Sequence, residues 1–509
     1  MSDYHEPRVF LVGAGPGHPG LLTLRALECL AKADLVIYDR LVSSRLLDFA
    51  PSSAERVCVT AIAEHHVERC PHVNDLLVKA AREGKRVVRL KGGDPLIFGR
   101  GGEEAEILRQ EGIPFEIVPG VTAAVAAAAC AGIPLTHRLH SSAVALITGH
   151  ENPEKPEANL DWSALARFPG TLAIYMGMSR LSQIVKSLLE HGKASDTPSA
   201  VVFMASTGAQ RTVTATLADL PEAVEKAGLT SPSIVLIGEV VELRQQLAWF
   251  EHRPLFGKSV LVTRPKDQAA ELAQRLDELG AVVHLLPAVE IQEPEDWTPV
   301  DRAIECLATF QWLAFTSVNG VHAFLRRLRN KGKDLRALGT IKIAVIGSAT
   351  ADALRSYHLE PDLMPDKFRS EELAEALREK VRGQRVLLAR ADRGREVLPL
   401  ELSKVAEVTQ IAVYRQADAV IRDSEPLNCL SKGEIDYVLL TSSNIARAFA
   451  AALNDKARET IQSGHTKIVS ISPVTSAAVR ELGWSVAAEA REFSTKGVVQ
   501  SLLELARAK

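Results

Sequence analysis

The sequence predicts a multidomain α/β protein. Its 509 residues suffice for about three or four compact domains. Two observations give the fold class. Up to about residue 250, short β-branched runs alternate with helical patterns, as in α/β units with largely parallel strands. After residue 257, a segment of about 125 residues occurs twice. We therefore expect two α/β subdomains in the N-terminal half and two similar α/β lobes in the C-terminal half.

The N-terminal half gives the clearest element pattern. A strand at 9–12 enters the glycine loop 13–17, a helix follows over 23–33, and a second strand, 35–38, ends at Asp39. The remaining expected strands are 86–90, 115–118, 171–176, 199–204 and 233–237. A polar, proline-rich segment at 151–159 divides subdomains of about 1–150 and 160–250. Because ligand sites of α/β folds form at the carboxyl ends of strands, we expect the loops there to gather.

The composition narrows the class of protein. With 46% hydrophobic and 24% charged residues, the chain reads as a soluble globular protein. Its 60 Lys and Arg against 63 Asp and Glu leave a net charge of -3, which argues against a nucleic-acid partner. The longest apolar run, 121–135, is shorter than the ~20 residues that cross a bilayer, so we expect no membrane span. Six dispersed cysteines without a secretory signal predict a cytoplasmic protein with reduced thiols.

Two glycine loops leave alternatives open. The loop 13–17 could cradle a dinucleotide phosphate, as in a nicotinamide-dependent dehydrogenase, or form a tight strand-to-helix turn. Pro16 argues against the dinucleotide because it removes a backbone donor. The loop 91–95, Lys-Gly-Gly-Asp-Pro, is either a turn closed by Asp94 or a loop whose exposed backbone binds a ligand.

Taken together, five ordered motifs resemble a known family. They are Gly-Ala-Gly-Pro-Gly-His-Pro-Gly-Leu-Leu-Thr at 13–23, Tyr-Asp-Arg-Leu-Val-Ser at 38–43, Val-Val-Arg-Leu-Lys-Gly-Gly-Asp-Pro at 87–95, Ile-Phe-Gly-Arg-Gly-Gly-Glu-Glu at 97–104, and Gly-Ile-Pro-Leu-Thr-His-Arg at 132–138. The segment from 8 to about 250 resembles the tetrapyrrole methylases, and specifically uroporphyrinogen-III C-methyltransferase. The resemblance implies that S-adenosylmethionine binds between two α/β subdomains.

The resemblance also implies roles for individual residues. Asp39 falls on the family's general base. The family usually has Gly-Lys-Arg-Ala-Gly after the third short strand, with the Lys as proton donor, whereas Ala61 stands here. We expect methyltransferase activity nevertheless, because the sulfonium leaving group needs no proton. The positions that correspond to the family's cofactor contacts are Pro16, Gly92, Gly93, Asp94, Ile97, Thr122, Ala123, Met176 and Ala205.

The same region holds His65, His66, Cys70 and His72 within eight residues. Such a cluster could bind a metal ion, but its spacing fits no closed zinc pattern. We interpret it as a substrate-facing or solvated loop and predict no metal.

The C-terminal half contains the repeat. Residues 257–264 match 383–390 at an offset of 126, and 315–319 match 440–444 at an offset of 125. A third pair, 346–350 and 471–475, has the same offset of 125. A repeat of this length indicates a duplicated α/β domain rather than a solenoid, whose periods run about 20 to 50 residues.

This half resembles uroporphyrinogen-III synthase, on the motifs at 260–265, 312–321, 413–415 and 440–443. The resemblance implies one lobe of residues 257–287 plus 416–509, and another of 288–415. Tyr414 would lie beside the cleft between the lobes and assist loss of the leaving hydroxyl. Hydroxyl groups at strand-to-helix junctions would hold substrate carboxylates or cap helices. They are Thr316, Ser317, Thr350, Thr441, Ser442 and Thr475.

The leading hypothesis is a bifunctional enzyme of tetrapyrrole biosynthesis. The half from 257 to 509 would close hydroxymethylbilane to uroporphyrinogen III, and the half from 1 to 250 would methylate that product twice, through precorrin-1, to precorrin-2. The family resemblance further implies a homodimer through the methyltransferase half. The alternatives are a tetrapyrrole-binding sensor without turnover, and a synthase with a degenerate methyltransferase domain.

Overall fold

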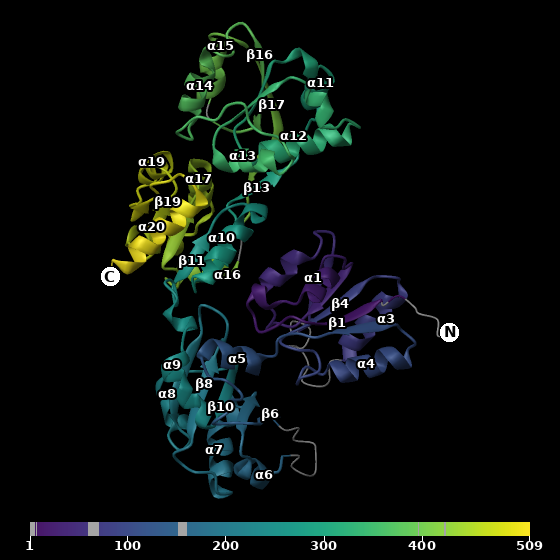
Figure 1. Cartoon of the computed structure of the whole chain (residues 1–509), viewed down its shortest axis with the longest axis vertical. Coiled ribbons are helices and arrows are strands. Elements are labelled where there is room, and N and C mark those ends of the chain that lie inside the picture. The colour runs from purple at the N-terminus through teal and green to yellow at the C-terminus, as the bar shows by residue number, and fades with distance from the viewer. Residues whose placement is uncertain are drawn as a thin grey trace. The chain divides into compact units, whose positions relative to one another are not determined.

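A computed structural model describes residues 6, 8–59, 71–150, 160–394, 396–421 and 424–508. The chain forms two compact units (Figure 1). The first comprises Met1–Lys258 with Asp277–Val282, and the second Ser259–Leu276 with Val283–Lys509. Across the described ranges, no helix has both the length and the apolar composition that a bilayer crossing requires.

The first sheet of the N-terminal unit is parallel throughout, in the order β3-β2-β4-β1-β5. Its strands are β1 (Val9–Gly13), β2 (Leu35–Tyr38), β3 (Glu55–Cys58), β4 (Val87–Lys91) and β5 (Phe115–Val118). Helix α1 (Leu24–Leu30) packs on one face, while α3 (Pro71–Arg82) and α4 (Gly101–Gln110) pack on the other. Because all strands are parallel, the loops after β1, β2, β4 and β5 meet at one edge.

The second sheet has the order β6-β7-β10-β8-β9. Its strands are β6 (Val144–Thr148), β7 (Thr171–Tyr175), β8 (Pro198–Phe203), β9 (Arg211–Thr216) and β10 (Ser233–Ile237). Helices α6 (Trp162–Arg167), α7 (Leu181–Glu190) and α8 (Leu220–Lys226) cover one face. Helix α5 (Ala123–Ala131), which follows β5 of the first sheet, packs on the other face. A short helix, α9 (Arg244–Leu247), follows β10.

The expectation of largely parallel strands is wrong for this second sheet. Strand β10 runs antiparallel to both β7 and β8, and β9 runs antiparallel to β8. Only seven residues, 204–210, connect β8 to β9, and a connection this short joins antiparallel strands because a parallel pair needs a longer crossover. Alternation of strand and helix patterns identifies strands but does not give their direction.

One lobe of the C-terminal unit holds a sheet in the order β12-β11-β18-β19-β20. Its strands are β11 (Ser259–Val262), β12 (Val282–Leu285), β18 (Tyr437–Leu440), β19 (Lys467–Ser470) and β20 (Ala488–Glu489). Its helices are α10 (Lys266–Glu278), α16 (Glu425–Ser431), α17 (Ser443–Ala452), α18 (Asp455–Gln462), α19 (Pro473–Glu481) and α20 (Thr495–Arg507). Both ends of the unit's sequence therefore contribute to this lobe.

The other lobe holds a sheet in the order β13-β17-β16-β14-β15. Its strands are β13 (Val289–Gln292), β14 (Trp312–Phe315), β15 (Lys342–Val345), β16 (Arg385–Ala391) and β17 (Glu407–Asp418). Its helices are α11 (Thr298–Glu305), α12 (Val318–Asn330), α13 (Ser348–Arg355), α14 (Ser370–Arg378) and α15 (Val397–Ser403). Strands β13 and β17 pair antiparallel, with Gln292 opposite Arg415, and form the two connections between the lobes.

The two lobes repeat one topology, as the sequence repeat predicts. Strands β17-β16-β14-β15 occupy the order of β12-β11-β18-β19. Ser317 caps α12 and Ser442 caps α17, with backbone φ/ψ of -164/156° and -163/160°. The duplication therefore extends to local backbone geometry.

Candidate active sites

Two glycine loops of the N-terminal unit join at the carboxyl edge of the first sheet. Gly15 and Gly93 exchange backbone hydrogen bonds, at 3.1 Å from the Gly15 N–H and 2.8 Å from the Gly93 N–H. A Cβ atom added to Gly120 would lie 2.2 Å from the Gly93 carbonyl oxygen, and one added to Gly13 would lie 2.5 Å from the Gly120 Cα. Three backbone segments therefore meet here at a distance that only glycine permits.

Asp94 fastens these loops to one another. Its Oδ1 accepts a hydrogen bond from the Leu96 N–H at 2.8 Å, and its Oδ2 accepts one from the Gly120 N–H at 3.0 Å. Gly92 is exposed beside it. The carboxylate of Asp94 thus orders the loop, while the backbone around Gly92 remains open to a ligand.

Tyr175, at the end of β7, joins the two sheets of this unit. Its phenol oxygen accepts a hydrogen bond from the Ala124 N–H at 3.1 Å and lies 2.7 Å from the Thr122 hydroxyl oxygen. Tyr175 therefore caps helix α5, whose N-cap residue Thr122 makes no capping bond itself. The Phe98 ring packs on Tyr175, with ring centroids 4.8 Å apart.

Strained backbone surrounds this junction. Phe98, Arg100, Met176, Met204 and Ser206 all have positive φ, between 46 and 69°. Such conformations cost non-glycine residues of order 1–3 kcal/mol each and cluster at functional sites. Both sheets thus contribute strained segments beside the loops that carry Thr122 and Asp94.

A network of four charged side chains lies below the same edge. Arg89, on β4, donates from Nη2 to the Asp39 Oδ1 at 2.7 Å and from Nε to the Glu104 Oε1 at 3.0 Å. Lys91 donates from Nζ to the same Glu104 oxygen at 2.8 Å. Arg89, Lys91 and Glu104 are buried, while the Asp39 side chain is 34% exposed. Burial lowers the pKa of Lys91.

This network fixes the orientation of the Asp39 carboxylate. It is the only one of the four side chains that reaches solvent to a large extent, and Arg89 fixes its carboxylate from behind. Glu104 Oε2 is buried and has no hydrogen-bond partner among the described residues. Asp39 is thus held as an oriented carboxylate at the carboxyl end of β2.

In the C-terminal unit, Tyr414 and Ser317 lie together. Their hydroxyl oxygens are 3.0 Å apart, and the Ser317 hydroxyl also accepts the Gly320 N–H of helix α12 at 3.0 Å. Tyr414 is 5% exposed, and burial raises the pKa of its phenol. The phenol is therefore protonated at neutral pH and can donate a hydrogen bond.

The other predicted hydroxyl groups divide by exposure. Thr316 and Thr441 are half-buried, and Ser442 caps α17 by accepting the Ile445 N–H at 3.1 Å. Thr350 and Thr475 are buried, at 4% and 2% exposure. Little of either buried threonine is open to a ligand in this conformation.

Both halves of the chain are similar to known protein families. The family model of the tetrapyrrole (corrin/porphyrin) methylases matches residues 8–221, and that of uroporphyrinogen-III synthase HemD matches residues 270–500. The porphyrin biosynthesis protein HemD of Ruminiclostridium josui is 36% identical over 449 residues, which cover 88% of this chain and 89% of that protein. The chain belongs to the family that fuses a tetrapyrrole methylase to a uroporphyrinogen-III synthase.

Two further similar proteins are C-methyltransferases by name. The uroporphyrinogen-III C-methyltransferase of Bacillus subtilis is 38% identical and covers 70% of this chain and 73% of that protein. A crystal structure of the uroporphyrin III C-methyl transferase of Thermus thermophilus is 42% identical, with a TM-score of 0.40, and covers 46% of this chain and 94% of that one. As a methylase–synthase fusion, the chain is a bifunctional enzyme of tetrapyrrole biosynthesis.

The structure brings several predicted residues of the methylase half together. Gly93, Asp94 and Thr122 lie at the joined loops, with Ala123 as the first residue of α5. Ile97 packs on the core that includes α5, and Ala205 packs on the same core from the second sheet. Pro16 is half-buried in the loop after β1, and Met176 is 49% exposed after β7. Ala61, His65, His66 and Cys70 lie outside the described residues.

Several functional features were missed in the sequence. Tyr175 and Phe98 join the two sheets, and Arg89 with Glu104 orients Asp39. One signal was present: charged residues at alternate positions in the apolar strand 87–91 are costly unless they are paired.

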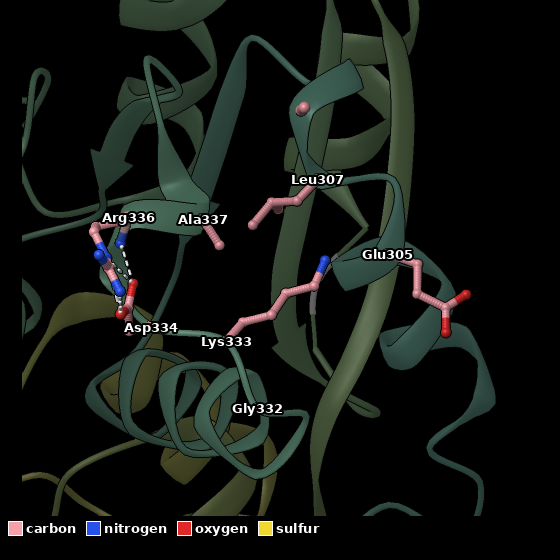
Figure 2. Close-up of a pocket in the computed structure, with 8 residues that line it drawn as sticks. Glu305, Leu307, Gly332, Lys333, Asp334, Arg336 and Ala337 are labelled. Atoms are coloured by element: carbon pink, nitrogen blue, oxygen red, sulfur yellow. Dashed lines mark hydrogen bonds and ion pairs between the residues drawn. The ribbon is translucent and has the colours of Figure 1, made fainter.

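Two pockets of the chain are lined by other residues. The pocket in Figure 2, about 380 Å³, lies between Leu307 and Arg336 in the second lobe. Among its lining residues, Lys333 Nζ donates to the Ile304 carbonyl at 2.9 Å, and Arg336 pairs with Asp334 at 2.7 Å. Another pocket, of about 530 Å³, includes none of the predicted site residues either. Among the described residues, no three His, Cys, Asp or Glu side chains are grouped to hold a metal ion.

Proposed function

We propose that residues 257–509 close hydroxymethylbilane to uroporphyrinogen III, and that residues 1–250 methylate this product twice, through precorrin-1, to precorrin-2. The observation that carries the proposal is that one chain matches both family models, one in each half. The product of the synthase reaction is the substrate of the methyltransferase reaction, so the fusion joins consecutive steps.

The joined glycine loops support S-adenosylmethionine as the methyl donor. Gly13 and Gly120 let the loops pack closely, since added Cβ atoms there would collide with backbone, whereas Gly92 is exposed and has only Leu41 within 4 Å of an added Cβ. When bound, S-adenosylmethionine supplies a methyl group on a cationic sulfur. The residues that would hold it are Pro16, Gly92, Gly93, Asp94, Ile97, Thr122, Ala123, Met176 and Ala205.

Asp39 would act as the base of the methyltransferase half. Its exposed carboxylate can accept a proton from the macrocycle as a ring carbon forms its bond to the methyl group. Arg89 holds the carboxylate at 2.7 Å, so it is oriented before substrate arrives. The rest of the half positions the two reactants, since the sulfonium leaves without protonation.

In the synthase half, the Tyr414 phenol would donate a hydrogen bond to the leaving hydroxyl of hydroxymethylbilane. Its raised pKa favours the protonated form that such a donor needs. Hydroxyl groups and first-turn N–H groups of α12 and α17 would bind substrate carboxylates. The residues are Thr316, Ser317, Thr350, Thr441, Ser442 and Thr475.

We also propose that the enzyme is a cytoplasmic homodimer through the methyltransferase half, without a nucleic-acid or membrane partner. Static light scattering on the purified chain tests this assembly. A monomer at micromolar concentration would contradict it.

The function is tested by giving the full chain hydroxymethylbilane with and without S-adenosylmethionine. We expect uroporphyrinogen III without the methyl donor and precorrin-2 with it, identified by mass spectrometry. Accumulation of unmethylated uroporphyrinogen III in both reactions would support a degenerate methyltransferase. Binding of both compounds without turnover would support the sensor alternative.

A further inference from the structure

Arg264 stands at the carboxyl end of β11 without a carboxylate partner. Its Nη1 donates to the Thr495 hydroxyl at 3.0 Å, and its Nη2 donates to the Gln268 side-chain oxygen at 3.0 Å. Both acceptors are neutral. Among the residues that the structure describes, no Asp or Glu carboxylate lies within ion-pair distance of the Arg264 guanidinium. The side chain is half-buried, and this burial lowers the pKa of Arg264. A guanidinium has five N–H donors, so some remain for a ligand.

Three buried or half-buried arginines, Arg89, Arg327 and Arg390, differ from Arg264 in this respect. Arg89 pairs with two carboxylates, and Arg327 makes two bonds of 2.7 Å to Asp301. Even Arg390, which occupies the equivalent place in the sequence repeat, has Glu396 at 3.7 Å. Burying a cation without an anion costs free energy, so an uncompensated arginine calls for a function.

A second arginine contacts the segment that bonds Arg264. The guanidinium of Arg369, which precedes α14 of the other lobe, lies 5.3 Å from the centre of the Phe493 ring. Phe493 is two residues before Thr495, the Arg264 partner. No described carboxylate makes an ion pair with Arg369 either. Two unpaired cations, one from each lobe, therefore flank residues 493–495.

The surrounding atoms suit an anion. Helix α20 begins at Thr495 and spans 13 residues, so its positive end lies at the Arg264 contact. The parallel strands β11, β18 and β19 bring Arg264 to the same sheet edge as the caps Ser442 of α17 and Ser472 of α19. This edge presents cations, hydroxyl groups and first-turn N–H groups together.

We propose that Arg264 and Arg369 form a carboxylate-binding site of the synthase half, which binds acidic side chains of the tetrapyrrole from both lobes. The site rests on the proposed synthase activity and identifies the part of its substrate that the protein recognises. Arginine binds carboxylates with paired N–H donors, and a polycarboxylate chain can occupy both guanidinium groups at once. Binding between the lobes would hold the linear substrate in a folded shape before its ends join.

The test uses the full chain with Arg264→Gln, Arg369→Gln and the double variant. A hydrogen bond to a charged group contributes enough that each single variant should raise the KM for hydroxymethylbilane about 10- to 100-fold, with a smaller effect on kcat. Arg480→Gln is the matched control, because Arg480 is exposed in the last turn of α19 and loses the same charge. We expect its KM to equal that of the wild type.

Thermal unfolding separates binding from a structural role. Because Arg264 has no anionic partner, Arg264→Gln should leave Tm unchanged or raise it, whereas loss of a structural arginine would lower it. An unchanged KM in both single variants, or a lower kcat together with a lower Tm, would overturn the site. Absence of synthase activity in the wild type would instead refute the proposed function. Methylation of supplied uroporphyrinogen III should stay at the wild-type rate in every variant.

Discussion

The charged network below Asp39 allows a prediction that separates chemistry from stability. Asp39→Asn and Glu104→Gln each remove one carboxylate that faces Arg89, and each keeps the size of the side chain. Asp39 is 34% exposed and lies at the strand end, whereas Glu104 is buried and bonds both Arg89 and Lys91. If Asp39 is the base, the first variant should lose rate and the second should lose stability.

The magnitudes follow from the contacts. Removing one partner of a buried ion pair costs about 3–5 kcal/mol, so Glu104→Gln should lower the Tm of this unit by about 6–20 °C. Asp39 makes one charge-assisted bond and is partly solvated, so Asp39→Asn should cost about 1–2 kcal/mol, or about 2–8 °C. Loss of a positioned base typically lowers the rate about 10²- to 10⁴-fold.

The assay follows methyl transfer from S-adenosylmethionine to uroporphyrinogen III at a temperature where both variants are folded, with Tm measured in parallel. We expect Asp39→Asn to methylate at least about 100-fold more slowly at nearly unchanged cofactor affinity. Glu104→Gln should keep the wild-type order of magnitude. A wild-type rate in Asp39→Asn would refute the reasoning. Equal loss of rate in both variants would assign the effect to the network as a whole.

Three further predictions follow from single contacts. Tyr414→Phe should slow ring closure about 10-fold or more and raise the share of the type I isomer of uroporphyrinogen. Unchanged turnover would show that Tyr414 serves only in packing. In differential scanning calorimetry, Gly120→Ala should lower Tm strongly because its Cβ would lie 2.2 Å from the Gly93 carbonyl oxygen. Gly102→Ala is the control: its Cβ would meet no atom within 4 Å, so it should raise the free energy of unfolding by about 0.5–1 kcal/mol. Hydrogen bonds lower the pKa of Glu251 although burial raises it, so its ionised form should stabilise the fold above about pH 4.5. The Tm difference between wild type and Glu251→Gln should shrink as pH falls below that value, and a difference that grows on acidification would contradict the assignment.

The sequence predicts the parts of the site that are local. Strand ends followed by glycine or aspartate mark the loops after β1, β2 and β4, and these loops do share one edge of a parallel sheet. Asp39 could be selected because it directly follows an apolar strand. The direction of β10 could not be predicted, since a buried antiparallel strand and a buried parallel strand have the same apolar pattern.

Contacts between distant residues account for what the sequence does not predict. Tyr175 caps a helix that begins 52 residues earlier, and Arg89 reaches Asp39 from 50 residues away. Such pairings depend on which strands become neighbours, and that order is a property of the whole sheet. Charged residues such as Arg89, Lys91 and Glu104 in apolar surroundings indicate a buried ion-pair network. The sequence pattern does not show that Asp39 is the partly exposed member of that network.

The repeat explains why the two synthase lobes can share a scaffold and still differ at the site. In one lobe, Val469 of β19 pairs with Ala488 of β20. In the other lobe, the equivalent residues Ala344 and Leu363 form a single isolated β-bridge. Both pairs are separated by an offset of 125, so the loss of a strand leaves the backbone path in place.

The arginines diverge in the same manner. Arg264 and Arg390 occupy equivalent positions of the repeat, yet only Arg390 has a carboxylate within 4 Å. Equivalent backbones with unequal charge give the folded substrate two different surfaces. If the substrate binds between the lobes as we propose, this inequality lets the duplicated fold distinguish one end of the asymmetric substrate from the other.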